Sequence, residues 1–364
     1  MKIKNIIDCI QKIAPISLQE HYDNSGLLTG QVDQPASGVL ISLDCTEEII
    51  DEAIELGFNL VVCHHPIIFS GLKKLNGSNY IERVIIKAIK NDIAIYACHT
   101  NLDNIYQGVN FKIANKIGLV NSNVLVKKSG ILKKLVTFCP TDYSEKVRLA
   151  MFAQGAGKIG NYDCCSFNTE GFGTFKPSEI ANPFVGEKNN IHVEKEIRIE
   201  VLFEQHLQPK IIEALKSSHP YEEVAYEIYN LENTHPLVGS GLVGELKTEE
   251  EELSFLRRIK QIFNCGSVRH THLIGKPVKK VAVCGGSGSF LLQQAIASGA
   301  DLFISSDFKY HQFFDAENKI VIADIGHFES EQFTSEIFYE VIQENFPKFA
   351  VRLTKKYTNP INYL

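Results

Sequence analysis

The chain has 364 residues, of which 44% are hydrophobic and 22% are charged, an ordinary composition for a globular protein. Its formal net charge of −6 argues against a broad electrostatic surface for nucleic acid or for an anionic membrane. The length predicts two or more domains. The nine cysteines include no Cys-x-x-Cys pair and the N-terminus is too polar for a signal peptide, so we expect a cytoplasmic protein without membrane partners.

The first part of the chain predicts a β-α-β-α-β segment. Its three expected strands are the apolar runs 38–44, 59–63 and 93–98, and Gly57 marks the end of the helix before the second of them. Such continuous apolar strands are typical of a parallel sheet covered by helices on both faces.

The middle part, residues 127–234, has a different pattern, because its strands alternate apolar and polar residues as in a sheet with one wet face. Two β-α-β units here predict an inserted ferredoxin-like α+β domain. The expected elements are strands 134–139, 197–203 and 223–229 and helices 144–155 and 209–217. The Gly/Phe/Pro-rich stretch from Gly171 to Gly186 is expected to be a long loop.

The last part repeats the first. Residues 53–65 align with residues 295–307, with the Ala-Ile, Gly and Leu positions coinciding at one offset. A second β-α-β-α-β half is therefore predicted, and residues 1–126 and 235–364 should form one discontinuous α/β core. The repeat also predicts that Ser306 and Asp307 occupy the position of His64 and His65.

Three polar clusters follow apolar strands, where open α/β sheets place their sites. They begin at His64-His65, at His99 and at His327. Five side chains in them are candidate metal ligands: His64, His65, Asp103, His327 and Glu331. That number exceeds what one catalytic zinc needs and suits two divalent ions that share a bridging glutamate. Imidazole and carboxylate ligands suit zinc, with manganese or iron as alternatives.

Each cluster also has a simpler interpretation. One residue of the His64-His65 pair can be a packed core histidine, and His327 with Glu331, one helical turn apart, can be a surface hydrogen bond. For His99 three roles are considered: a metal ligand, a base, or a group that orients a ligand. Asp307 and His311 are candidates for acid–base or substrate-contact roles, with local capping and packing as the alternative.

The segment Gly285-Gly286-Ser287-Gly288-Ser289 follows an expected strand and precedes an expected helix, 290–298. It lacks the spacing of a P-loop or dinucleotide fingerprint. Two interpretations of this segment are considered, an anion cradle at a helix N-terminus and a tight turn. The cradle would favour a phosphate-bearing substrate.

Taken together, these motifs resemble the Nif-three-like family, whose members are called GTP cyclohydrolase 1 type 2 homologues. The resemblance covers the whole chain and rests on six stretches: residues 22–30, 64–69, 99–103, 285–288, 306–311 and 324–331. Residues 127–234 resemble the CutA-like or PII-like ferredoxin-type domain of the longer bacterial members.

The resemblance implies a dinuclear centre whose ligands are the five candidates above, with Glu331 bridging, and a toroidal homohexamer whose sites face an internal cavity. It implies a metal-dependent hydrolase of a nucleotide-like substrate, most specifically GTP ring opening, with His99, Asp307 or His311 carrying protons. The alternative is a non-enzymatic metal-binding regulator or scaffold with protein partners, since eukaryotic relatives have a name that refers to interaction with a transcription factor.

Overall fold

Three buried parallel strands form the centre of the first sheet, as the apolar runs predict. In the computed structural model, which describes residues 1–364, these strands are β2 (Val39–Ser42), β3 (Leu60–Cys63) and β4 (Ala94–Ala97). The edge strands are β1 (Gly26–Thr29) and β15 (Val351–Leu353), in the order β1-β4-β3-β2-β15.

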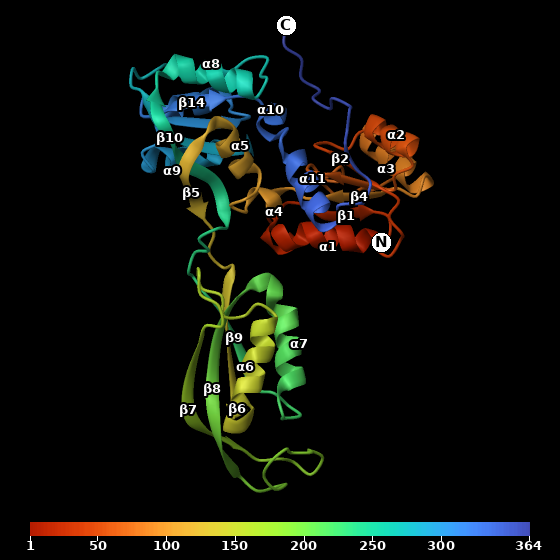
Figure 1. Ribbon diagram of the computed structural model, residues 1–364, viewed down its shortest axis with the longest axis vertical. Helices are drawn as coiled ribbons and strands as arrows, with labels where there is room; N and C mark the ends of the chain where they lie inside the picture. Colours follow the sequence, from red (N-terminus) through yellow and green to blue (C-terminus); the bar gives the residue numbers. More distant parts are fainter. The chain divides into compact units, whose positions relative to one another are not determined.

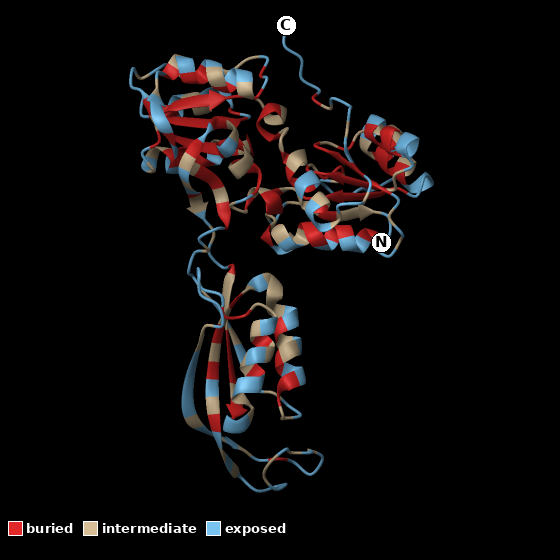
Figure 2. Ribbon diagram, viewed as in Figure 1, coloured by how far each residue is buried: buried red, intermediate tan, exposed pale blue.

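Helices cover both faces of this sheet, because its central strands are apolar on both sides (Figures 1 and 2). One face packs against α2 (Glu47–Leu56) and α3 (Tyr80–Lys90). The other packs against α1 (Ile3–Ile13) and α11 (Thr334–Asn345). Gly57 ends α2 with a φ of +66°, a conformation that glycine adopts without steric cost.

The second sheet has the order β11-β14-β13-β12-β10-β5. Its strands are β5 (Leu119–Lys127), β10 (Gly239–Glu250), β11 (Arg269–His270), β12 (Val278–Ser287), β13 (Leu302–Ser306) and β14 (Val321–Asp324). Strands β12, β13 and β14 are parallel neighbours, like β2, β3 and β4. The link from β13 to β14 holds a 3-10 helix, Tyr310–Ala316, so the expected α-helix is absent there.

The remaining helices of the two sheets lie between these strands, and two of them, α4 and α10, carry candidate ligands. They are α4 (Thr100–Asp103), α5 (Val109–Ile117), α8 (Glu252–Ile262), α9 (Leu292–Ala297) and α10 (His327–Glu331), with 3-10 turns at Ile16–Leu18 and Ser289–Leu291. The two sheets and their helices make one compact unit, Met1–Lys127 with Pro236–Leu364.

Residues Lys128–His235 form a second compact unit. Its four-stranded sheet has the order β7-β8-β6-β9, with antiparallel neighbours, and α6 and α7 lie along one face (Figure 1). The elements are β6 (Leu132–Pro140), α6 (Ser144–Ala153), β7 (Ser166–Phe175), β8 (His192–Glu204), α7 (Gln208–Ser218) and β9 (Tyr226–Asn230), with 3-10 turns at Thr141–Tyr143 and Gln205–Leu207.

The long loop expected from Gly171 is wrong for its first five residues, which belong to β7. Pairing with β8 supplies the backbone hydrogen bonds of this segment, with Gly171 opposite Glu196. A Cβ at Gly173 would lie 2.1 Å from a carboxylate oxygen of Glu196, so a larger residue there would displace that side chain. The mixed α/β class is confirmed, and no helix of the chain combines the length and apolar character needed to cross a membrane.

His219, at the end of α7, is buried in a neutral form. Its Nε2 donates to the carbonyl of Phe138 at 2.9 Å, and its Nδ1 accepts from the Tyr221 amide at 3.1 Å. Burial lowers the pKa of His219 and outweighs the bond to Phe138 and the charge of Glu196, which both raise it. The Tyr221 amide donates to Nδ1, which fits a ring without a second proton.

Candidate metal centre

The ends of strands from both sheets bring the predicted ligands together. His64 and His65 follow β3, and both of their amides donate to the carbonyl of Leu43, which turns the chain across the end of β2. Asp103 ends α4, the short helix after β4. His327 and Glu331 begin and end α10, which follows β14.

One group consists of His65, His327 and Glu331. The Oε2 atom of Glu331 lies 2.8 Å from Nε2 of His65 and 3.1 Å from Nε2 of His327, and the two imidazole nitrogens are 3.2 Å apart. Three donor atoms this close, two of them nitrogens, can bind one ion.

A second group consists of His64, Asp103 and the same glutamate. Nε2 of His64 lies 3.5 Å from Oδ1 of Asp103 and 3.8 Å from Oε1 of Glu331. Both the His64 Nε2 and the Asp103 Oδ1 are buried and have no hydrogen-bond partner. Unpaired buried polar atoms are unfavourable, and an ion between these ones would satisfy both. The donors therefore fit a divalent metal.

Each histidine is oriented through its other ring nitrogen. Nδ1 of His64 bonds to the carbonyl of Cys98 at 2.9 Å, and Nδ1 of His65 bonds to Asp44 at 2.7 Å. Nδ1 of His327 bonds to Asp307 at 2.6 Å. A proton held on Nδ1 leaves the Nε2 lone pair directed at the cluster, as in most histidine–metal sites.

The charges of the cluster raise the affinity of the imidazoles for protons. Burial lowers the pKa of His65, but its bonds to Asp44 and Glu331 outweigh burial and raise the pKa to about 10. Burial also lowers the pKa of His327. The charge of Glu331 and the bond to Asp307 outweigh burial and raise this pKa to about 11. The pKa of Glu331 falls well below its usual value, against burial, because of the His327 charge. A metal ion must displace protons here.

His99 lies beside the cluster. Its ring centroid is 5.2 Å from that of His64 and 5.5 Å from that of His65, and its Nδ1 bonds to Asp23 at 2.8 Å. Burial would raise the pKa of Asp23, but the bond to His99, the charge of His99 and a bond from the Thr100 hydroxyl lower it. Asp23 is therefore a carboxylate that fixes the His99 ring.

The other two candidates differ in position. Asp307 contacts the cluster through His327, whereas His311 is exposed and its ring contacts those of Tyr310 and Phe314. The interpretation of the sequence missed Asp23 and Asp44 as orienting residues. The available signal for Asp44 was its position at the end of the first strand, beside the strand that leads to His65.

The Gly285-Gly286 segment serves the cluster. A Cβ at Gly286, whose φ is +63°, would lie 2.3 Å from Oε1 of Glu331. The amide of Gly286 donates to Ser330 and that of Gly285 donates to Asn110, so neither is directed to an anion. Of the two interpretations of this segment, these contacts support the tight turn rather than the anion cradle.

A cavity of about 450 Å³ opens onto the donor atoms. Its lining includes the site residues His65, His99, Asp103, His327 and Glu331 and the aromatic residues Tyr22, Phe69 and Phe290. Its lining includes no Lys or Arg. This volume suits a small-molecule ligand.

Comparison with known proteins identifies the family. The model of the Duf34/NIF3 (NGG1p interacting factor 3) family matches residues 1–360. A Halalkalibacterium halodurans protein named GTP cyclohydrolase 1 type 2 homolog is 40% identical over 90% of this chain and 89% of its own, and a Bacillus subtilis protein of the same name is 37% identical over 99% and 98%. The crystal structure of a Bacillus cereus protein related to NIF3 has a TM-score of 0.86 and 36% identity, covering 100% of this chain and 99% of that one. The predicted resemblance is confirmed: the chain belongs to the Duf34/NIF3 family.

Proposed function

We propose that this protein is a hydrolase of a nucleotide-like substrate that depends on two divalent metal ions. The observation that carries the proposal is the sharing of Glu331 between two donor groups, one with His65 and His327 and the other with His64 and Asp103. Each carboxylate oxygen faces a different group, which supports a bridging role for Glu331. Zinc fits these nitrogen and oxygen donors, as do manganese and iron.

Two ions held in this way would lower the pKa of a water molecule and polarise a substrate oxygen. The residues of the chain perform the other tasks. His99, fixed by Asp23, is placed to accept or donate a proton at the edge of the cavity. Tyr22, Phe69 and Phe290 offer flat faces to a base.

The name of the relatives and the aromatic residues that line the cavity support a nucleotide-like substrate. Because no Lys or Arg lines it, phosphate groups that entered would depend on the ions for charge compensation. GTP, the substrate in the name of the relatives, is the first compound to test because of that name, together with simple phosphoesters.

The deciding experiment incubates protein loaded with zinc, manganese or iron with GTP and with phosphoesters. We expect turnover by the wild type and loss of turnover in His99→Asn without loss of metal. His311→Asn is the matched control, because its exposed ring does not line the cavity. If no compound is turned over while Glu331→Gln still removes bound metal, the hydrolase proposal fails and a metal-binding regulator becomes the better account.

The rest of the architecture is part of the same proposal. The order β-α-β-β-α-β in Lys128–His235 supports an inserted ferredoxin-like domain, and the two parallel trios of strands support a repeated core. The proposed domains are a discontinuous core, residues 1–126 and 235–364, and an insert, residues 127–234. Limited proteolysis near residues 127 and 235 tests this division. Light scattering tests the mass of the homohexamer that the family resemblance implies, and electron microscopy tests its toroidal shape.

A further inference from the structure

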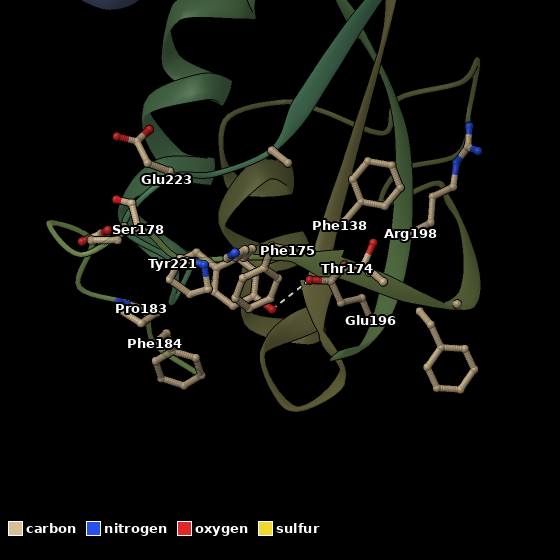
Figure 3. A pocket seen from close by; sticks show the side chains of 18 of the residues that line it. Phe138, Thr174, Phe175, Ser178, Pro183, Phe184, Glu196, Arg198, Tyr221 and Glu223 are labelled. Atoms are coloured by element: carbon tan, nitrogen blue, oxygen red, sulfur yellow. Dashed lines mark hydrogen bonds between the residues drawn. The ribbon is translucent and has the colours of Figure 1, made fainter. Parts of the chain in front are cut away.

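The Lys128–His235 unit contains a second, larger cavity, of about 740 Å³ (Figure 3). Its floor includes Phe138 on β6 and Glu196 and Arg198 on β8. These residues alternate with Cys139 and other core residues that pack under α6 and α7. The floor is therefore the face of the sheet that these helices leave uncovered.

Aromatic rings form a wall of this cavity. The ring centroid of Tyr221 lies 6.0 Å from that of Phe175 and 6.2 Å from that of Phe184. Figure 3 shows the rings of Phe175 and Tyr221 close together, with Phe184 on the loop beside them. Such faces bind flat apolar groups and attract cations.

A carboxylate lies beside these rings. Glu196 is 8% exposed, and the hydroxyl of Tyr221 donates to its Oε1 at 2.8 Å (Figure 3). Burial and this bond raise the pKa of Tyr221, so the hydroxyl keeps the proton that it donates. No Lys, Arg or His nitrogen forms an ion pair with Glu196. Its negative charge therefore faces the cavity without a cation from the protein.

The remaining charges of the lining do not reverse this balance. Three further glutamates line the cavity, against two cationic residues, Lys176 and Arg198. The guanidinium of Arg198 is 3.0 Å from a carboxylate oxygen of Glu200, so Arg198 is already paired. Of the three glutamates, Glu170 is likewise paired, with Lys195 at 2.9 Å, which leaves Glu222 and Glu223 against Lys176. A cationic ligand would be favoured here and an anionic one disfavoured.

We infer that this cavity binds a small organic cation, an amine carried on a flat apolar body. The ammonium group would bond to Glu196, and the body would contact Tyr221, Phe175 and Phe184. A buried carboxylate beside aromatic faces supplies both the counter-charge and the cation–π attraction that such a ligand needs. This site is separate from the metal centre in its residues and in its ligand chemistry.

Tryptamine is a suitable probe, because it is an amine on a flat ring and the chain contains no Trp. Its indole fluorescence can therefore be followed in the presence of the full-length protein without background from tryptophan. We expect saturable binding of tryptamine and no binding of indole-3-propionate, which has the same ring with a negative charge. Glu196→Gln should weaken binding about tenfold to a hundredfold, the range for a lost charged hydrogen bond.

Two further variants make the test independent of folding effects. Glu213→Gln removes an exposed carboxylate on α7 that does not line the cavity, and it should bind tryptamine like the wild type. Phe184→Ala removes a half-exposed ring from the wall and should weaken binding severalfold.

Two results would overturn the inference. The first is the absence of saturable tryptamine binding, and the second is equal affinity of the wild type and Glu196→Gln. If the first result came with a change of oligomeric mass in Glu196→Gln or Phe184→Ala, the face would be assigned to contact with a second copy of the chain.

Discussion

Glu331→Gln is the most informative single substitution at the metal centre. Oε2 of Glu331 lies 2.8 Å from Nε2 of His65, and Oε1 lies 3.8 Å from Nε2 of His64, so each oxygen belongs to a different donor group. Glutamine keeps the shape but has one oxygen and no charge. At least one ion would lose a ligand in this variant. Loss of a residue that only orients a ligand weakens metal affinity about tenfold to a hundredfold, or about 1.4 to 2.8 kcal/mol, so the metal affinity of Glu331→Gln should fall by more than this.

The assay is metal analysis after dialysis, joined to competition with a chelator of known affinity. The wild type should retain two ions per chain, and the variant should retain one or none. Glu329→Gln is the matched control, since Glu329 is a buried carboxylate on the same helix that bonds to Asn359 and belongs to neither donor group. Equal metal content and affinity in Glu331→Gln and the wild type would refute the bridging role.

Three other predictions concern different parts of the chain. Gly286→Ala should remove bound metal, because the new methyl group would displace Glu331. Gly299→Ala is the control: its φ is similar and the space around it is open, so it should lower the melting temperature without changing the metal content. Retention of metal by Gly286→Ala would contradict this prediction. Asp307→Asn should weaken metal binding about tenfold to a hundredfold in a chelator titration, because it removes the charge that holds its histidine, and an unchanged affinity would exclude that role. The pKa of His219 is lower in the folded chain than in the unfolded chain, so the unfolded chain binds more protons below about pH 6.5. The free energy of unfolding therefore decreases as the pH is lowered through this range. Calorimetry at pH 7 and pH 5 should therefore show a smaller loss of stability in His219→Gln than in the wild type, and equal losses would contradict the neutral form.

The core of the fold and the meeting of the polar clusters follow from local pattern. Continuous apolar runs form buried parallel strands, and the carboxyl ends of such strands meet at one edge. His64, His65 and Asp103 could therefore be placed together with His327 and Glu331 before any coordinates were known. Their roles as ligands stay a prediction that metal analysis must test.

The orienting residues could not be predicted, because a hydrogen-bond partner depends on tertiary packing. Asp23 reaches His99 across 76 positions of sequence, and Asp44 reaches His65 across 21. His311 lies away from the cluster because the segment after Asp307 continues into a 3-10 helix that carries its ring to the surface.

The cavity of the Lys128–His235 unit also lay outside the reach of sequence patterns. Gly171 and Gly173 indicate a loop by composition, whereas pairing with β8 makes the segment a strand. The cavity depends on that pairing, because Gly173 leaves the space that the carboxylate of Glu196 occupies. Long-range pairing overrode local propensity here.

The central claim is that two ions share Glu331, and anomalous diffraction from crystals of the metal-loaded wild type tests it most directly. The account predicts two anomalous peaks per chain, one between His65 and His327 and the other between His64 and Asp103, with the carboxylate of Glu331 between the peaks. A single peak bound by only one group, or peaks at other residues, would contradict it.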